Sequence, residues 1–543
     1  MNHRRLTPLA LMLGLTVLVA RPAHAAPIGE TTPGQARALK CFDGIRASIR
    51  TTPTTIALGQ STTVSWTATV PAGCSQIRFS MGATPVGRAG TFTDQPISNS
   101  RYALLASYGA AGSAEVAVAS LQVILPPVLS INSNQGNVRW QMAQALATPN
   151  QTVIVANNVE LDLTGMRNIS IAEGVRFRGG RTSREPGPRL FTTTRVPVLF
   201  SVAGDNVRIT GLRIEGPEMG VSDQDEPSRG IHFDSRVGVE IDHNEISGWS
   251  HAGISIWDTA QRMDPAINPG AVNIHDNYIH HNQHQGGEGY GVTVAYGAYA
   301  RITRNVFDWN RHAIEGSGAS GTGYEATANL VLANGGLHFW VPFPGTWIHT
   351  HQFDMHGTDN CGVWSVAKDS LWNCGLAGGS MVIRQNTFLY TAGRAIKLRG
   401  TPENGMFIGG NVFARPFLFD TAFANGAYIE GAIGQTETGL VIEPGNQLGV
   451  DGSTRVGTCD FDGDGVNDSF MATGATWWFS SGGLRPWTYL NTSTRQLSQV
   501  QLGYFDSDNR CDVSVDGVVY SGGTTVVQTF WVGGGRPGVL ATR

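Results

Sequence analysis

The residues best able to do chemistry gather in one stretch of the chain. All of the 14 histidines except His3 and His24 lie between His232 and His356. Lys397, just beyond them, is one of only three lysines in a chain with 38 basic residues. Carboxylates, imidazoles and cations are the groups that supply acids, bases and charge stabilisation. The candidate catalytic residues are Glu315, Asp354, His356, Lys397, Arg399 and His312.

These residues fall at matching positions of short alternating segments, "GIHFDS", "GISIWD", "GVTVAY", "AIEGSG", "QFDMHG" and "AIKLRG". Alternate side chains of a β-strand point to opposite faces. Inward positions would be Ile231, Ile254, Val292, Ile314, Phe353 and Ile396. One outward column would then read His232, Ser255, Thr293, Glu315, Asp354 and Lys397. The next would read Asp234, Trp257, Ala295, Ser317, His356 and Arg399. The last three segments bring the candidate catalytic residues together.

This column allows two reactions on a sugar chain. Glycosidic hydrolysis needs one protonated and one ionised carboxyl group, which Glu315 and Asp354 could provide, because close like charges raise one of the two pKa values. β-Elimination needs a cation such as Arg399 facing a uronate carboxylate, and a base such as Lys397 or a histidine.

Three other interpretations of the same residues stay open. The charges could form a ladder that only stabilises a long solenoid. Calcium could bind between Glu315 and Asp354 in the groove. Zinc could bind the histidines His280, His281 and His284, or His349 and His351.

Aromatic residues flank the charged column. Two inserts, 335–350 and 358–380, carry tryptophans on either side of Asp354, and Cys361 and Cys374 would close the second insert. Indole rings stack on the apolar faces of sugars. The candidate substrate-binding residues are Trp257, Tyr290, Trp340, Trp347, Trp364, Trp372 and Arg394.

An internal repeat organises residues 200–435. Segments such as "VEIDHNEISG", "VNIHDNYIHH" and "ARITRNVFDW" align, and the shared position carries Leu212, Asn244, Asn277, Asn305, Asn329, Asn386 and Asn411. Asparagine tolerates left-handed backbone angles, and its amide can hydrogen-bond to the asparagine of the next coil. Such coils cannot bury an apolar face alone and must stack. We therefore assign these asparagines to coil corners.

The repeat resembles the right-handed parallel β-helix proteins of the pectate-lyase-like type. The resemblance implies an all-β fold with a β-helix over 130–445, and it implies carbohydrate as ligand. That family includes lyases, hydrolases, epimerases and adhesins, so the resemblance does not fix the reaction. We find neither the aspartate set of polygalacturonases nor the Asp-Pro-His-Asp signature of alginate epimerases.

Smaller β units are expected on both sides. Residues 46–126 resemble a bacterial immunoglobulin-like β-sandwich. Residues 455–535 resemble FG-GAP-type calcium repeats, because "CDFDGDGVNDSF" sets oxygen ligands Asp460, Asp462, Asp464 and Asp468 around two glycines. A second loop, "YFDSDNRCDV", repeats the pattern less completely. We expect a structural calcium ion in the first loop and a propeller-like unit around it.

The start of the chain is typical of an exported protein. Residues 1–25 have a basic start, an apolar run and an Ala-His-Ala cleavage pattern, as in a signal peptide. The six cysteines then suggest disulfides in an oxidising compartment, with Cys41–Cys74, Cys361–Cys374 and Cys459–Cys511 as the local pairs. Only 15% of residues are charged and 69 are glycine, which is typical of a turn-rich β protein.

Together these observations predict a secreted bacterial polysaccharide-degrading enzyme, lyase or glycosidase, acting on an acidic glycan. The alternative is a non-catalytic glycan-binding protein or surface adhesin that uses the same groove. The formal net charge of −4 argues against nucleic acid as a partner, and no segment after residue 25 predicts stable membrane insertion.

Overall fold

The structure is a computed structural model that describes residues 41–108, 113–217, 227–284, 287–335, 337–339, 347–358, 375–419, 421–424, 427–429, 431–435 and 439–527. Side chains within 337–339, 347–349, 421–429, 435 and 453–454 are not described. The predicted signal peptide, Trp340, Trp364, Trp372 and the Cys361–Cys374 pair lie outside the described residues. The chain divides into two compact units, Met1–Ile124 and Leu125–Arg543. No described helix is long and apolar enough to cross a membrane.

The first unit is built from two sheets that enclose one apolar core. One sheet holds β1 (Arg46–Thr52), β3 (Thr62–Thr69) and β6 (Ala89–Asp94). The other has the order β2 (Thr55–Ala57), β8 (Ser113–Ile124), β7 (Ser100–Ser107), β4 (Arg78–Met81) and β5 (Thr84–Val86). Strand β3 alternates buried and exposed residues, as expected where one face of a sheet packs on a core. A disulfide joins Cys41 to Cys74, as predicted.

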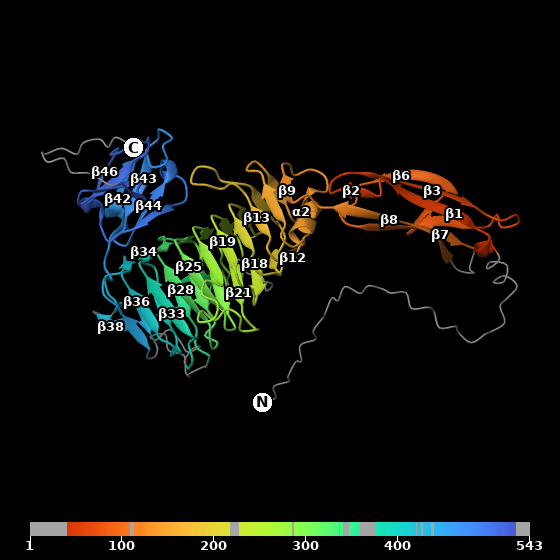
Figure 1. Ribbon diagram of the computed structural model, residues 1–543. Helices are drawn as coiled ribbons and strands as arrows, with labels where there is room; N and C mark the ends of the chain where they lie inside the picture. The colour runs from red at the N-terminus through yellow and green to blue at the C-terminus, as the bar shows by residue number, and fades with distance from the viewer. Residues whose placement is uncertain are drawn as a thin grey trace, which may run out of the picture. The chain divides into compact units, whose positions relative to one another are not determined.

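The second unit is a right-handed parallel β-helix with three long sheets (Figure 1). Sheet A contains β9 (Val128–Ile131), β10 (Thr152–Val155), β13 (Arg176–Arg178), β16 (Arg208–Thr210), β19 (Val239–Asp242), β22 (Val272–His275), β25 (Tyr299–Thr303), β28 (Gly323–Thr327), β33 (Ser380–Arg384), β36 (Met406–Gly409) and β41 (Leu440–Ile442).

Sheets B and C complete each coil. Sheet B contains β11 (Glu160–Asp162), β14 (Arg189–Phe191), β17 (Arg213–Glu215), β20 (Glu245–Ser247), β23 (Tyr278–His280), β26 (Val306–Asp308), β29 (Leu330–Val331), β34 (Thr387–Phe388) and β37 (Val412–Phe413). Sheet C contains β12 (Ile169–Ile171), β15 (Phe200–Val202), β18 (Arg229–Asp234), β21 (Ala252–Trp257), β24 (Tyr290–Ala295), β27 (His312–Gly316), β32 (Phe353–Met355), β35 (Ile396–Leu398) and β40 (Ile433–Gln435).

One continuous core runs through the coils, from Ile131 to Ile433. A helix that the sequence interpretation missed, α2 (Val138–Leu146), contacts the first strands of sheets A and C and buries Met142, Ala145 and Leu146. We had expected only strands in this capping segment. The helix covers the core where no earlier coil exists to stack on it.

The aligned asparagines form the predicted ladder at the corner between sheets A and B. Each is fully or almost fully buried, and its side-chain NH₂ donates to the amide oxygen of the next one along the series Asn244, Asn277, Asn305, Asn329, Asn386 and Asn411. Asn411 donates in turn to Asn446, which is partly exposed and was not predicted. One detail was wrong. The left-handed residue is the one before the asparagine, such as His243 with φ 56° or Asp276 with φ 55°. The turn there leaves the asparagine free to hydrogen-bond along the stack.

Replacing one ladder asparagine should destabilise the whole unit. In Asn305→Ala, the backbone N–H and the side chain of Asn277 both lose their acceptor, and the carbonyl oxygen of Ile274 loses its donor. Unsatisfied buried groups cost about 1–3 kcal/mol each, so we expect a loss of at least ~2 kcal/mol in the free energy of unfolding. Denaturant titration measures it. Asn273→Ala, which removes one surface bond to Gly270, is the control and should cost less than half as much.

Residues beyond the last coil form two small antiparallel sheets, joined by the predicted disulfide Cys459–Cys511. One holds β42 (Val456–Cys459), β43 (Asp468–Ala472), β44 (Thr476–Ser480) and β45 (Thr488–Thr492). The other holds β46 (Gln501–Gly503), β47 (Asp512–Val515), β48 (Val518–Ser521) and β49 (Thr525–Val527). Short 3-10 helices are η2 (Gly452–Arg455), η3 (Ser481–Gly483) and η4 (Leu497–Gln499). Two short antiparallel pairs project from the coils, β30 (Leu337–Phe339) with β31 (Trp347–His349), and β38 (Thr421–Ala424) with β39 (Ala427–Ile429).

We call residues 456–527 the C-terminal module. It packs on the flank of the β-helix, because Met471 and Trp478 form one apolar cluster with Val306 and Leu330 of sheet B. Thr387 of β34 also donates a hydrogen bond to Thr473 of the module, at 2.8 Å.

Candidate functional site

The outward column predicted on sheet C has the predicted register. His232 pairs with Ser255, Ser255 with Thr293, Thr293 with Glu315, Glu315 with Asp354, and Asp354 with Lys397 on successive strands. The inward neighbours Ile231, Ile254, Val292, Ile314, Phe353 and Ile396 are all fully buried. Alternation along each strand therefore brings Glu315, Asp354 and Lys397 onto adjacent strands.

Asp354 is the centre of this site. Its carboxylate is fully buried, and Arg399 donates to both oxygens, at 3.0 Å from Nε to Oδ1 and 2.7 Å from Nη2 to Oδ2. The guanidinium of Arg399 and the nearby histidines hold the pKa of Asp354 well below its usual range, despite the opposing effect of burial. Asp354 is therefore ionised. Our prediction that crowding would leave one carboxyl of the Glu315–Asp354 pair protonated is wrong for Asp354, because a cation outweighs the second carboxylate.

Three imidazole rings approach the same carboxylate oxygen. Oδ2 of Asp354 lies 2.9 Å from Nε2 of His351, 2.8 Å from Nε2 of His356 and 3.9 Å from Nε2 of His312. Of these, only His356 is appreciably exposed, with 27% of its side chain accessible. Nε2 of His356 is buried and forms no hydrogen bond with the described residues, so its 2.8 Å contact with Asp354 is electrostatic. His356 is thus the imidazole that a molecule in the groove could reach.

His312 and His351 are interior residues. Their rings stack with centroids 4.2 Å apart, and Nδ1–H of His312 donates to the carbonyl oxygen of His351 at 2.6 Å. Burial lowers the pKa of His351 to about 3 and that of His312 well below its usual value, so both rings are neutral near pH 7. We had proposed His312 as a catalytic base, but a fully buried ring does not reach a polysaccharide.

His312, His351 and Asp354 also form a group of possible metal ligands, whose ligand atoms lie within 4.8 Å of one another. The guanidinium of Arg399 occupies this group, since its Nη2 lies 2.7 Å from Asp354 Oδ2 and 2.6 Å from His351 Nε2. A divalent cation would meet a permanent positive charge there. The predicted groove calcium fits poorly for the same reason, because Asp354 is already neutralised.

Glu315 and Lys397 lie on either side of Asp354. Glu315 accepts a hydrogen bond from Thr293, and its Oε1 is 3.8 Å from Nε2 of His356. Lys397 is only 3% exposed. Nε2 of His356 is therefore close to the carboxylates of both Glu315 and Asp354. Lys397 lies on the next strand, β35.

The structure separates the predicted substrate-binding residues. Trp257 is half-buried and forms an aromatic group with His232 and the 56% exposed Tyr296, at centroid distances of 4.8 and 5.0 Å. This group is an open platform on sheet C. Tyr290 and Arg394, by contrast, are 8% and 4% exposed, so neither offers an open stacking face. The side chain of Trp347 is not described.

Sequence reasoning missed Arg311. Its side chain lies over the ring of Tyr290, 5.7 Å from the centroid, and it is close enough to Asp354 and Arg399 to interact with their charges. Arg311 is 9% exposed, and its buried Nε and Nη1 have no hydrogen-bond acceptor among the described residues. Arg311 directly precedes His312, one position before β27, where the alternation that identified the other residues does not apply.

The first aspartate loop of the C-terminal module has ligand geometry. Carboxylate oxygens of Asp460, Asp462 and Asp464 lie within 4.8 Å of one another, and both buried oxygens of Asp462 lack a hydrogen bond. Arg184 of the β-helix approaches Asp462 at 3.0 Å. Asp468 differs from our prediction. Its carboxylate accepts backbone N–H groups of Phe461, Asp462 and Gly482 and so shapes the loop.

The comparison with protein families agrees with the fold. Residues 197–334 match a family model described as "Right handed beta helix region". One solved structure, a family 28 exopolygalacturonase from Yersinia enterocolitica, is similar over 72% of this chain and 96% of its own, with 9% identity and a TM-score of 0.26. At these values the similarity assigns no residue role and no activity. No curated protein matches the chain.

Proposed function

We propose that this protein is an extracellular polysaccharide-degrading enzyme that binds an acidic glycan along the outer face of sheet C. The arrangement of Asp354 carries the proposal. A buried, ionised carboxylate oriented by Arg399 lies 2.8 Å from Nε2 of the partly exposed His356, and its charge would stabilise the imidazolium that forms when His356 acts as a general base. The Trp257–Tyr296 platform lies on earlier strands of the same sheet and would hold a sugar ring.

β-Elimination suits these groups best. In this reaction Nδ1 of His356 removes the proton from the carbon that bears the uronate carboxylate. The electron pair of the broken C–H bond forms the new C=C bond. The bond to the leaving glycosidic oxygen breaks, and that oxygen takes a proton from water. The uronate carboxylate must be neutralised for the proton to leave, and Arg311 is the proposed cation, since its Nε and Nη1 have no acceptor among the described residues.

Hydrolysis by Glu315 and Asp354 is less well supported. It needs a carboxyl group that is protonated near neutral pH, and the pKa of Asp354 is shifted in the opposite direction. Asp354 could act only as the ionised partner, so Glu315 would have to be the acid.

The test is an assay of the whole secreted protein on uronate-containing and neutral polysaccharides. We expect new reducing ends together with absorbance at 235 nm from uronate substrates only. Reducing ends without that absorbance would make the protein a hydrolase. Binding without any turnover would make it a glycan-binding protein or surface adhesin and would refute the enzymatic proposal.

We also propose that the first loop of the C-terminal module holds a structural calcium ion through Asp460, Asp462 and Asp464. Oδ2 of Asp462 supports this assignment, because it is buried and has no partner among the described residues, whereas Oδ1 lies 3.0 Å from Nη2 of Arg184. Similarity to FG-GAP repeats for this module, and to immunoglobulin-like modules for residues 46–126, remains part of the proposal. The two disulfides are consistent with export.

Calcium should raise the melting temperature of the protein. At a calcium concentration of 100 Kd, a ligand that binds only the folded state stabilises by about 2.7 kcal/mol. Differential scanning calorimetry in calcium and in excess chelator measures this, and Asp462→Asn should remove the difference. Asp516→Asn, an exposed carboxylate in the same module, is the control and should keep it. Equal melting temperatures in calcium and chelator would refute the assignment.

A further inference from the structure

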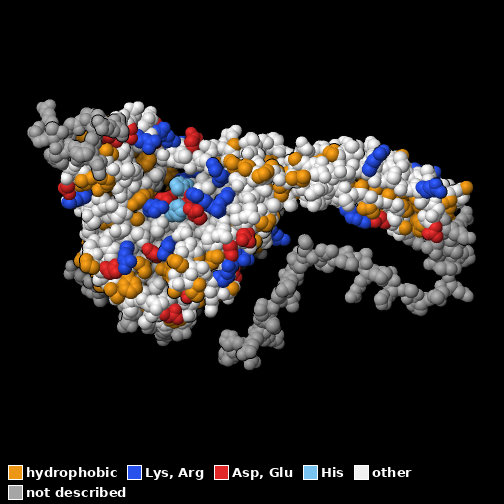
Figure 2. Space-filling model, in the orientation of Figure 1, with side chains coloured by type: hydrophobic (Ala, Val, Ile, Leu, Met, Phe, Trp, Pro, Cys, Tyr) orange, Lys and Arg blue, Asp and Glu red, His pale blue; other side chains and the backbone are white. Residues whose placement is uncertain are grey.

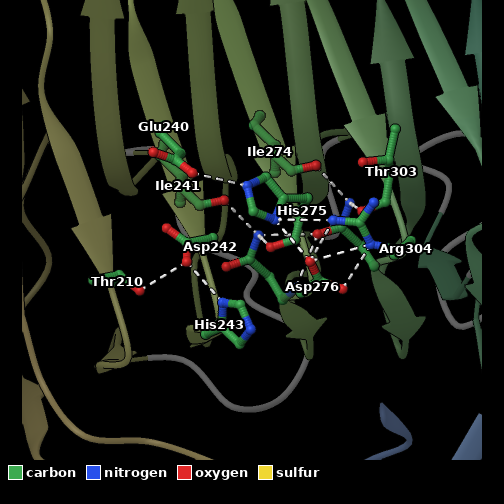
Figure 3. A network of polar contacts seen from close by, with 12 residues as sticks. Thr210, Glu240, Ile241, Asp242, His243, Ile274, His275, Asp276, Thr303 and Arg304 are labelled. Atoms are coloured by element: carbon green, nitrogen blue, oxygen red, sulfur yellow. Dashed lines mark hydrogen bonds and ion pairs between the residues drawn. The ribbon is translucent and has the colours of Figure 1, made fainter. Parts of the chain in front are cut away.

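A second polar cluster lies away from the proposed catalytic column, at the corner between sheets A and B. Figure 2 shows histidines gathered with acidic and basic side chains over the β-helix beside the C-terminal module. Figure 3 shows how Asp242, His243, His275, Asp276 and Arg304 contact one another at the ends of β19, β22 and β25. Neither the proposed reaction nor the asparagine ladder uses these side chains.

The backbone conformation makes this corner unusual. The residue before each ladder asparagine has a left-handed backbone, and it is glycine before the last two asparagines of the series, at Gly410 and Gly445. Three successive coils instead have His243, Asp276 and Arg304 there, with φ between 54° and 56°. Ala328 and Gln385 of the next two coils share this conformation, which is uncommon for residues other than glycine but which aspartate and histidine adopt more often than most. The three side chains therefore stack at a position where glycine would be easier.

Each of the three is held by neighbours. His243 Nδ1 lies 2.7 Å from the buried carboxylate of Asp242, which Arg208 and Thr210 also bond. This contact fixes the ring while half of the side chain stays exposed. Asp276 Oδ2 accepts a hydrogen bond from Nη2 of Arg304, at 2.7 Å. The same oxygen lies 2.7 Å from Nδ1 of His275.

A cavity of about 150 Å³ opens over this corner. Its floor includes His243, Asp276 and Arg304, and its walls include Arg181, Tyr278 and the module residues Trp487 and Tyr489. The guanidinium of Arg304 lies over the ring of Tyr489, 5.5 Å from its centroid. The cavity therefore combines aromatic faces with hydrogen-bond donors and acceptors, which is the chemistry of sugar recognition.

The charged side chains that line the cavity indicate whether it suits a charged or a neutral ligand. Arg304 is neutralised by Asp276, and Arg181 has Glu245 at 3.5 Å and donates to the carbonyl oxygen of His243. No described cation of the cavity is left for a phosphate or a uronate carboxylate. The volume is below the roughly 300–1,000 Å³ of sites for drug-sized ligands, so it suits a single ring.

We propose that this corner pocket binds one neutral sugar ring, stacked against Trp487 and hydrogen-bonded by His243, Asp276 and Arg304. The site is separate from the catalytic column on sheet C. It would anchor a neutral residue or side branch of a glycan while sheet C holds the acidic chain.

The experiment is saturation-transfer NMR on the whole protein with methyl glycosides of glucose, galactose and mannose, and with glucuronic and galacturonic acid. We expect saturation transfer to at least one neutral glycoside, at millimolar affinity, and weaker transfer to both acids. Trp487→Ala should weaken that binding by about tenfold or more. His243→Asn, which keeps a residue that tolerates the left-handed backbone, should also weaken it.

Controls separate this pocket from the catalytic proposal. Gln385→Asn changes the equivalent corner residue of a later coil, φ 58°, and should leave binding unchanged. Preference for the acids would overturn the proposed ligand. Binding that survives both Trp487→Ala and His243→Asn would overturn the location, as would absence of binding to every glycoside. A failure of the catalytic proposal would appear instead as missing turnover with this binding intact.

Discussion

Asp354→Asn should reduce turnover of the uronate polysaccharide by about 10³-fold while the protein still folds. The neutral amide no longer balances the imidazolium that forms when His356 takes a proton, and general acid–base catalysis contributes about 10²–10⁴-fold. The substitution also leaves Arg399 buried beside an uncharged group, so some stability is lost. Initial rates at 235 nm and denaturant unfolding measure the two effects separately.

The chain provides a matched control for this variant. Asp242 is also fully buried, accepts both bonds of an arginine, Arg208, and contacts a histidine, His243. Asp242→Asn should therefore cost similar stability, yet keep nearly full turnover. If both variants lose stability and neither loses turnover, sheet C bears a structural charge ladder and Asp354 is no part of the catalytic machinery.

The free energy of unfolding should fall steeply as the pH drops below about 6.5. His312 and His351 have pKa values that burial lowers in the folded protein, to about 3 for His351, whereas in the unfolded chain they take a proton near pH 6.5. The unfolded state then binds more protons, so acid favours it. Each histidine contributes about 1.4 kcal/mol per pH unit, or roughly 3 kcal/mol per unit together. The contributions of His312 and His351 to the free energy of unfolding are fully present above pH 6.5.

Urea unfolding at several pH values between 7.5 and 4.5 tests this. His351→Gln should reduce the slope by about 1.4 kcal/mol per pH unit, because one of the two buried bases is gone. His243→Gln, which removes a half-exposed ring instead of a buried one, is the comparison variant. His275 and Asp308, whose pKa values are raised, act in the opposite direction, but equally in all three proteins. An unchanged slope in His351→Gln would contradict the assignment of a buried, neutral His351.

The sequence alone determined the coil architecture and the order of the column. Alternation of period 2 requires that Ile314 and Phe353 point inward if Glu315 and Asp354 point outward, and stacking of equivalent coils then sets the register. The asparagine ladder followed from the same repeat, since equivalent residues of stacked coils must be neighbours. These features depend on local pattern and on repetition, and both are visible in the chain.

Only the tertiary structure decided which of these groups could act. Partners from three coils set the charge of Asp354, and burial separated the reachable His356 from the enclosed His312. Arg311 went unnoticed because it precedes its strand, outside the alternating pattern. Cavities such as the corner pocket form where Trp487 meets His243, 244 positions apart in numbering. Desolvation and long-range contacts control these properties, and neither depends on sequence spacing.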